Sequence, residues 1–305
     1  MEQRRNVRKS LKIRELRRVA IVGVGLLGGS IGLALRAAGF GGVRVGVGRR
    51  ESSLRKALAC DTVDEVTCDP AAGVAGAELV ILCTPIGRFE ALLRQIVPAL
   101  AEGAFVTDVA STKAEVVRLA ERLLPRSVRF VGSHPMAGSE KTGVEFARAD
   151  LFQDALCLLT PTARTAPVAV REVGHFWEAL GARTLKLTPA RHDRFLARAS
   201  HLPHATAAAL VRLAQAQGAI DVAGPGFADA TRIASGDPAM WTDIFRTNRK
   251  AMVQAVDRLI AELAGLRARL EKDDARGLEK WLTDSKEARD QWVARRYRKP
   301  RGREA

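Results

Sequence analysis

The chain has 305 residues, of which 47% are hydrophobic and 27% charged, a globular composition long enough for two domains. Its formal net charge of +15 is typical of nucleic-acid-binding proteins. However, most of the excess lies at the ends: residues 1–18 hold eight basic and two acidic side chains, and residues 286–305 hold eight and three. Aromatic residues that could stack on bases make up only 5%. The pattern indicates solvated basic tails and argues against nucleic acid as the main partner, leaving only weak, salt-sensitive RNA binding.

The cysteines and the N-terminal segment indicate in which cellular compartment the protein lies. Cys60, Cys68, Cys83 and Cys157 form no C-x-x-C pair, so we expect reduced thiols, no metal site and a cytoplasmic protein. A basic leader before the uncharged residues 19–35 is also typical of a signal peptide or anchor. That stretch contains five glycines and is followed by no small-residue cleavage site, so we predict no membrane association.

A glycine-rich turn joins an apolar strand, Val19–Val22, to an apolar helix that continues through Ser30–Leu35. The turn has the spacing G-x-G-x-x-G, and a second apolar strand, Val43–Val47, follows at the distance of a βαβ unit. This order of elements predicts a dinucleotide site in which the helix N-terminus binds the pyrophosphate. We assign four residues of the turn to the cofactor site: Gly23, Gly25, Leu27 and Gly28.

The end of the second strand bears on the choice of cofactor. Enzymes that use NAD commonly place an acid here to bind the ribose 2′-hydroxyl. This chain has Arg49, Arg50 and Ser52 instead. Because guanidinium groups bind a 2′-phosphate that a carboxylate would repel, we predict NADP, with NAD as the alternative. In a second interpretation both arginines are solvated loop residues.

Further strands should end at the same edge of the sheet. Leu79–Thr84 is a continuous apolar run, which places Thr84 and Pro85 beside the nicotinamide half of the cofactor. After the strand Ala104–Asp108, Ser111 or Thr112 is suited to cap the helix that runs to Leu124. Because Ser111 follows a strand's carboxyl end, a role toward the substrate stays open as well.

A short strand, Arg129–Gly132, is followed at once by His134. Since proline and glycine come next, we expect this histidine on a turn beyond the strand rather than in a core, where functional groups tend to lie. By position alone it is either catalytic or structural. Strands at Ala155–Thr160 and Arg183–Leu187, with a helix between them, should complete the sheet.

From Pro189 onward the pattern changes to long helices. We expect one over residues 190–217, kinked at Pro203, and others over residues 227–235, 238–270 and 274–296. The predicted fold is therefore an α/β Rossmann-type doubly wound sheet (residues 18–188) followed by an all-α domain (189–296) that forms a homodimer, between basic tails (1–17 and 297–305).

Four motifs, in this order, carry a specific resemblance: Asp108–Lys113 (DVASTK), Gly132–Gly138 (GSHPMAG), His201–His204 (HLPH) and Thr231–Asp243 (TRIASGDPAMWTD). Together they resemble the prephenate/arogenate dehydrogenase family of tyrosine biosynthesis, over about residues 17–285. The resemblance implies a Rossmann domain, a helical dimerisation domain, and oxidative decarboxylation of prephenate to 4-hydroxyphenylpyruvate with hydride transfer to NADP or NAD.

The resemblance also implies roles for single residues. His134 would contact the ring hydroxyl with help from Ser111, while Arg232 and His204 would shape the carboxylate pocket. An alternative for Arg232 is a structural ion pair with Asp229 or Asp237. The chain departs from many members at Arg49-Arg50, where an acid is common, and at Ala110, where glycine is usual.

The substrate is predicted to be prephenate rather than arogenate, whose side chain carries an ammonium group. Arg232, His204 and Lys141 facing that side chain would repel an ammonium, whereas Glu140 would attract it. Three alternatives stay open: an arogenate (cyclohexadienyl) dehydrogenase, a β-hydroxyacid dehydrogenase or imine reductase, and a non-catalytic NADP-binding sensor.

Overall fold

The computed structural model describes residues 11–138, 141–216 and 218–296. The expected N-terminal tail is described only from residue 11, and the expected tail 297–305 and Glu140 lie outside the described residues. Contacts divide the chain into two compact units, one ending at Met252 and the other beginning at Val253. The sheet and the helices up to α10 therefore belong to one unit.

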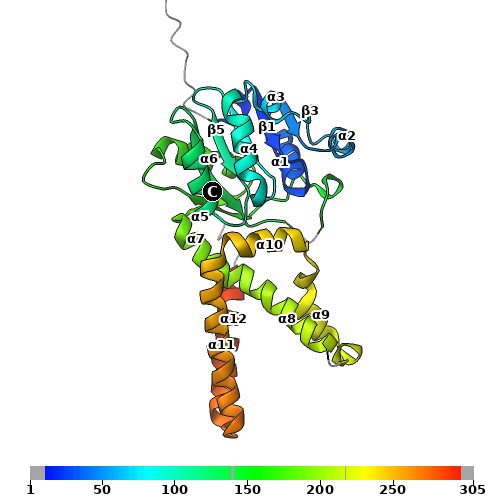
Figure 1. The fold of residues 1–305 in the computed structure, drawn as a ribbon, viewed down its shortest axis with the longest axis vertical. Coiled ribbons are helices and arrows are strands. Elements are labelled where there is room, and N and C mark those ends of the chain that lie inside the picture. Colours follow the sequence, from blue (N-terminus) through cyan, green and yellow to red (C-terminus); the bar gives the residue numbers. More distant parts are fainter. Residues whose placement is uncertain (1–10, 139–140, 217, 297–305) are drawn as a thin grey trace, which may run out of the picture. The chain divides into compact units, whose positions relative to one another are not determined.

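A single twisted sheet organises the first unit (Figure 1). Its strands among the described residues are β1 (Arg18–Val22), β2 (Val43–Val47), β3 (Glu65–Thr67), β4 (Leu79–Leu82), β5 (Phe105–Asp108), β6 (Arg129–Pro135), β7 (Leu156–Thr160) and β8 (Arg183–Lys186). Their spatial order is β3-β2-β1-β4-β5-β6-β7-β8, and each neighbouring pair is parallel except β6 with β7. The order in which strands are added to the sheet reverses between β1 and β4, which are parallel, and doubly wound sheets bind ligands at such a point. The predicted Rossmann-type sheet is confirmed.

The apolar runs of the central strands supply two cores. In β1, Val19 and Ile21 face one core, whereas Ala20 and Val22 face the other, because successive side chains point to opposite faces. All four are at most 2% exposed. Burial on both faces explains why these strands are continuously apolar rather than alternating.

Helices cover both faces of the sheet (Figure 1). One core includes residues of α1 (Leu26–Ala37), α2 (Glu51–Ala59) and α6 (Pro167–Ala179). The opposite core includes residues of α3 (Pro70–Val74), α4 (Phe89–Ile96) and α5 (Ala114–Leu123). Each crossover therefore buries its apolar face against the strands that it joins.

One expectation about β6 is wrong. The strand does not end at Gly132 but continues to Pro135, so His134 lies inside it, opposite Leu158 of β7. The reason is a change of partner: Arg129–Val131 pair with β5, whereas the remaining residues pair with the antiparallel β7. His134 is therefore only 8% exposed rather than presented on a turn.

The predicted helix over residues 190–217 consists of three parts. These are α7 (Pro189–Leu196), the π-helical turn η5 (Ala197–His201) and α8 (Leu202–Ala216). The irregularity precedes Pro203, because proline has no N–H to donate and its ring clashes with the preceding turn. π-helical turns of this kind are frequent at functional sites.

After α9 (Pro225–Thr231) and the 3-10 turn η7 (Arg232–Ser235), the expected helix 238–270 is broken into α10 (Pro238–Thr247) and α11 (Arg249–Glu271). The break occurs at Asn248, which is buried and whose side chain bonds to other helices. α12 (Ala275–Arg296) follows a short turn. Among the described residues, no helix is both long and apolar enough to cross a bilayer.

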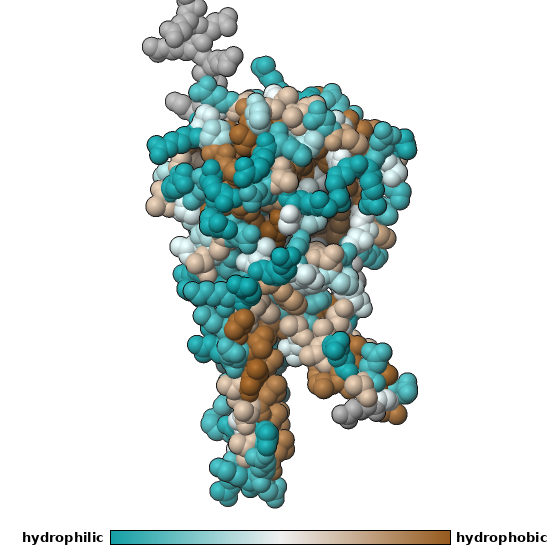
Figure 2. Space-filling model, viewed as in Figure 1, coloured by the Kyte–Doolittle hydropathy of each residue, from teal (hydrophilic) through white to brown (hydrophobic). Residues whose placement is uncertain are grey.

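α11 has an exposed apolar stripe. Its members recur at helical spacing and are 36–60% exposed: Val253, Val256, Ile260, Leu263 and Leu270. Figure 2 shows apolar side chains gathered along this part of the chain. A contiguous apolar face of this kind is typical of an association surface.

Candidate active site

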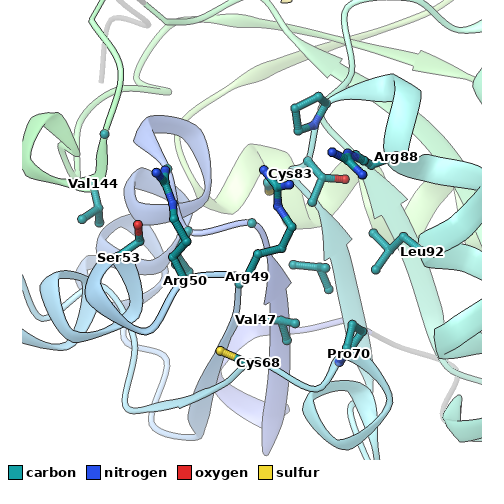
Figure 3. Close-up of a pocket in the computed structure, with 18 of the residues that line it drawn as sticks. Val47, Arg49, Arg50, Ser53, Cys68, Pro70, Cys83, Arg88, Leu92 and Val144 are labelled. Atoms are coloured by element: carbon teal, nitrogen blue, oxygen red, sulfur yellow. The ribbon is translucent and has the colours of Figure 1, made fainter.

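A cavity of about 690 Å³ lies at the carboxyl ends of β1, β2 and β4 (Figure 3). Six residues that the sequence assigned to the cofactor line it: Gly23, Gly25, Arg49, Arg50, Thr84 and Pro85. Leu27, Gly28 and Ser52 are not among the lining residues, and Ser53 contributes instead of its neighbour. Ser52 and Ser53 both lie in the first turn of α2, where successive side chains point in different directions, and only Ser53 faces the cavity.

The glycine turn forms a cradle at the start of α1. Gly23 has a φ of +104°, and a Cβ there would lie 2.7 Å from the carbonyl oxygen of Cys83. A Cβ on Gly28 would lie 2.0 Å from the carbonyl oxygen of Gly23. Gly25, by contrast, has no heavy atom within 4 Å of a Cβ position and caps α1 without a side-chain hydrogen bond. Open space before uncapped N–H groups fits the pyrophosphate of a dinucleotide.

A second feature of the cavity also fits a dinucleotide. The hydroxyl of Thr84 is buried and has no hydrogen-bond partner among the described residues. Buried hydroxyl groups are normally paired, so a bound ligand group is the expected partner. Thr84 is the second residue after β4 and lies beside the glycine turn.

The rim of the cavity is strongly basic. Arg49 and Arg50 extend from the end of β2, and among the described residues no carboxylate lies within 4.0 Å of either guanidinium (Figure 3). Lys56 also lines the cavity but faces Glu145 at 3.9 Å. The arrangement can bind an anionic group at the end of β2.

His134 sits at the junction of β6 and the helical segment. Its Nδ1 lies 2.9 Å from Nε2 of His192 on α7, and the two ring centroids are 5.1 Å apart. Burial lowers the pKa of His134 well below its ordinary value, and the nearby His192 and Lys113 lower this pKa further. The imidazole is therefore neutral at physiological pH and able to accept a proton.

A buried ion pair underlies this histidine. Asp108, at the end of β5, pairs with Lys113, and both side chains are fully buried. The same carboxylate accepts N–H bonds from Ala110 at 2.9 Å and Ser133 at 3.1 Å. Burial lowers the pKa of Lys113, an effect that Asp108 opposes. The pair fixes the residue before His134 to the neighbouring strand.

The expected capping of α5 is wrong. The helix begins at Ala114, and neither Ser111 nor Thr112 caps it. Asp193 of α7 does so, accepting from Lys113 N at 2.7 Å and Ala114 N at 2.9 Å. Thr112 bonds Thr247 instead, at 2.9 Å. Ser111 is half-buried, and its proposed role toward the substrate stays a prediction.

The residues predicted for the carboxylate pocket lie on several elements. His204 on α8 is buried and stacks on Trp241 of α10, with centroids 3.6 Å apart and ring planes 12° apart. Its Nδ1 has no hydrogen-bond partner among the described residues. Arg232 is exposed on η7. Lys141 lies over the ring of Phe146, 5.0 Å from its centroid.

One of the two aspartates suggested as partners of Arg232 has another role. Asp237 caps α10, accepting from Met240 N at 2.9 Å, and it also lines the cofactor cavity. The roles of Arg232, His204, Lys141 and Glu140 toward a substrate remain predictions.

Four of the chain's five histidines are buried together around α7 and α8: His134, His192, His201 and His204. Sequence reasoning identified the first and last but missed His192, Asp193 and Asn248. The amide of Asn248 donates to the carbonyl oxygen of Asp193 at 2.8 Å and contacts Nδ1 of His201 at 3.1 Å. Among the described residues, no group of three His, Cys, Asp or Glu side chains is arranged to hold a metal ion.

Comparisons with known proteins match both halves of the chain. Residues 31–186 match the family model for the nucleotide-binding domain of prephenate dehydrogenase, and residues 188–284 match the model for its dimerization domain. The chain is 34% identical to prephenate dehydrogenase of Bacillus subtilis, over 89% of this chain and 75% of that protein. It is 33% identical to cyclohexadienyl dehydrogenase of Zymomonas mobilis, over 89% of this chain and 94% of that protein.

A solved structure agrees with these matches. Prephenate dehydrogenase of Aquifex aeolicus, in complex with hydroxyphenyl propionate and NAD+, superposes with a TM-score of 0.83 at 33% identity, covering 90% of this chain and 98% of that one. The two family models together span most of the sequence. The chain therefore belongs to the prephenate dehydrogenase family of NAD(P)-dependent oxidoreductases.

Proposed function

We propose that this enzyme oxidises and decarboxylates prephenate with His134 as the general base and NADP as the preferred cofactor. The observation that carries the proposal is His134 itself, a neutral imidazole held between β6 and α7. One ring nitrogen is engaged by His192, and Nε2 has no partner among the described residues, which leaves it for a substrate hydroxyl.

The chemistry needs one proton acceptor. Prephenate carries a hydroxyl on the ring carbon that loses hydride, and removal of the hydroxyl proton by His134 favours formation of the carbonyl. When bound, the nicotinamide supplies the hydride acceptor. The bond between the ring and its carboxylate then breaks and carbon dioxide leaves. The electron pair of the broken bond stays in the ring and makes it aromatic. The resulting phenolate recovers the proton from His134, so the histidine ends neutral as it began.

Other residues would position the substrate. The Arg232 guanidinium is suited to bind a carboxylate through two parallel hydrogen bonds. His204, held flat against Trp241, has an unpartnered ring nitrogen that can bond the same group. The half-buried Ser111 follows β5, the neighbour of the strand that carries His134, and can assist that histidine. These assignments rest on the motifs and, for His204 and Ser111, on the burial of the side chains.

Preference for NADP is supported by the two guanidinium groups at the end of β2. A 2′-phosphate is a dianion, and Arg49 and Arg50 line the cavity without a carboxylate within 4.0 Å among the described residues. Replacing both by alanine should raise KM for NADP by about 10²-fold or more, since each charged hydrogen bond contributes about 1.5–3 kcal/mol. KM for NAD should change little because NAD has no 2′-phosphate.

A matched control separates recognition from net charge. Arg55 and Arg94 line no part of the cavity and pair with carboxylates one turn away on their own helices. Replacing these two by alanine removes the same charge and should leave the ratio of the two KM values unchanged. An equal loss for both cofactors in the Arg49/Arg50 variant, or a wild-type preference for NAD, would contradict the NADP assignment.

Prephenate is proposed over arogenate for electrostatic reasons. An ammonium about 4 Å from a like charge is destabilised by roughly 1 kcal/mol in water and about 4 kcal/mol near a protein surface. Arg232 and Lys141 supply that repulsion if they face the substrate side chain, whereas Glu140 would oppose it. Initial rates with prephenate and with arogenate, each with NADP and NAD, test the substrate and the cofactor together. A higher kcat/KM for arogenate would overturn the substrate assignment.

The role of His134 has its own test. His134→Asn should lower kcat by about 10²–10⁴ with little change in KM, as expected for loss of a general base. His175→Asn removes an exposed imidazole from α6 and serves as the control. An unchanged kcat in His134→Asn would remove His134 from the chemistry.

The enzyme is also proposed to be a homodimer. The exposed stripe of α11, which includes Ile260 and Leu263, is suited to pack against a second copy. Light scattering should give twice the monomer mass, and Ile260→Glu should give the monomer, whereas Glu262→Gln on the same helix should not. A wild-type monomer at micromolar concentration would refute the dimer.

A further inference from the structure

His134 is the end of a chain of buried hydrogen bonds that starts at a carboxylate. Asp193 Oδ1 lies 2.8 Å from Nδ1 of His192, and Nε2 of His192 lies 2.9 Å from Nδ1 of His134. We propose that His192 and Asp193 are positioning residues that fix the ring tautomer of His134, so that Nε2 is its proton-accepting atom. This proposal rests on the proposed role of His134 as the general base.

Asp193 determines which atom donates in each of these hydrogen bonds. Its Oδ1 accepts the backbone N–H of Lys113 at 2.7 Å, and its Oδ2 accepts that of Ala114 at 2.9 Å. These are the first N–H groups of α5, so the side chain here acts as a helix cap and a hydrogen-bond acceptor. An ionised carboxylate has no hydrogen to donate. The bond to His192 must therefore be donated by Nδ1 of the imidazole.

His192 passes this polarity on. The ring is fully buried, and burial lowers its pKa, so it carries one proton rather than two. That proton is on Nδ1, where the aspartate accepts it. Nε2 of His192 therefore presents a lone pair toward His134, and Nδ1 of His134 must donate.

The consequence falls on the last ring. His134 is neutral, so a proton on Nδ1 leaves Nε2 unprotonated. The opposite tautomer would place two lone pairs face to face at a separation of 2.9 Å, which is too short for a water molecule between them. The same bond also holds the plane of the ring. Two residues from α7 thus determine which atom of a β6 residue acts as the base.

Asp193→Asn tests this polarity. Oδ1 accepts from both Lys113 N and Nδ1 of His192, so an amide N–H₂ in its place loses the bond from Lys113, donates to Nδ1 of His192 and reverses both later bonds, while the amide oxygen still accepts from Ala114 N. We expect kcat to fall by about 10²–10⁴, the scale associated with a wrong histidine tautomer, with KM changed far less. In histidine labelled with ¹⁵N, the NMR signals of His134 should show its proton moved from Nδ1 to Nε2.

His192 supplies a second pair of variants. His192→Leu removes the acceptor for His134 and should lower kcat by a similar factor. His192→Gln restores an amide oxygen that can accept from Nδ1 of His134, and should recover at least tenfold of that loss. A residue that matters only for packing would not distinguish leucine from glutamine in this way.

His201→Asn is the matched control, since it removes another buried imidazole of the same group that does not bond to His134. Its kcat should stay within about threefold of wild type. If His134→Asn leaves kcat unchanged, the proposed function itself fails. The positioning role of His192 and Asp193 is refuted if His134→Asn lowers kcat but the His192 and Asp193 variants do not. It is also refuted if these variants lower kcat while the proton stays on Nδ1 of His134.

Discussion

The buried histidines should make the folded enzyme sensitive to acid, and His201 allows the effect to be calculated. Its ring is 1% exposed, and burial lowers its pKa from 6.5 to about 4. The amide of Asn248 donates one N–H to the carbonyl oxygen of Asp193, so its other N–H must donate to Nδ1 of His201. Protonation of that nitrogen would lose the bond and bury a charge.

The sign of the effect follows from proton binding. Below pH 6.5 the unfolded chain takes up a proton at this position that the folded chain resists, so stability falls as pH falls. With pKa values of 6.5 unfolded and about 4 folded, His201 costs about 2 kcal/mol at pH 5 and about 3 kcal/mol well below pH 4. The pKa values of His134, His192 and His204 are lowered too, which adds loss in the same direction.

Urea unfolding at pH 8 and pH 5 measures this loss. His201→Asn keeps an oxygen that can accept from Asn248 but cannot titrate, so its free energy of unfolding should fall by about 2 kcal/mol less than that of wild type between the two pH values. The cavity left by the smaller side chain lowers stability equally at both pH values and cancels in the difference. His175→Asn controls for loss of an exposed histidine. The same pH difference in His201→Asn as in wild type would refute the reasoning.

Four further substitutions test the cofactor and substrate sites. Gly28→Ala should lower Tm, because its Cβ would lie 2.0 Å from a backbone oxygen, whereas Gly25→Ala should leave Tm nearly unchanged but weaken cofactor binding; equal Tm values in the two variants would contradict this reading of the turn. Arg232→Ala should raise KM for prephenate by an amount equivalent to about 2–4 kcal/mol with little loss of stability, and a normal KM with a lower Tm would indicate a structural role instead. Thr84→Val should weaken cofactor binding by an amount equivalent to about 1 kcal/mol in calorimetry, and unchanged affinity would leave its buried hydroxyl unexplained.

The sheet was the most predictable part of the molecule because its strands are buried on both faces. Leu79–Leu82 is apolar at every position, and the structure puts β4 where the run predicts it. The glycine turn carries an equally local signal, since Gly23 and Gly28 each lie against a backbone atom, and Gly25 leaves open space before α1. Local chemistry of this kind can be interpreted without knowing the partners.

The errors in the helical half have a common physical cause. Asn248 interrupts an otherwise continuous helical pattern because its amide bonds two groups of the preceding helices. The short β3 and the helices beside it, between residues 51 and 74, were not anticipated, since β3 is only partly buried at the sheet's edge and carries no apolar run. In both cases tertiary contacts decide the local structure, and the helix and strand propensities of the residues carry no information about those contacts.

The same limit applies to the histidine proposed as the base. A motif can single out His134, but the atom that would take the proton depends on His192, 58 positions further along the chain. Asp193 in turn caps a helix 80 positions before it, so one carboxylate would both start α5 and set the tautomer. Neither His192 nor Asp193 belongs to a motif that the sequence made visible. Because the cap holds the carboxylate in place, the geometry of the proposed base depends on the packing of α7 against α5. Mutations in that contact should therefore lower kcat more than they weaken substrate binding.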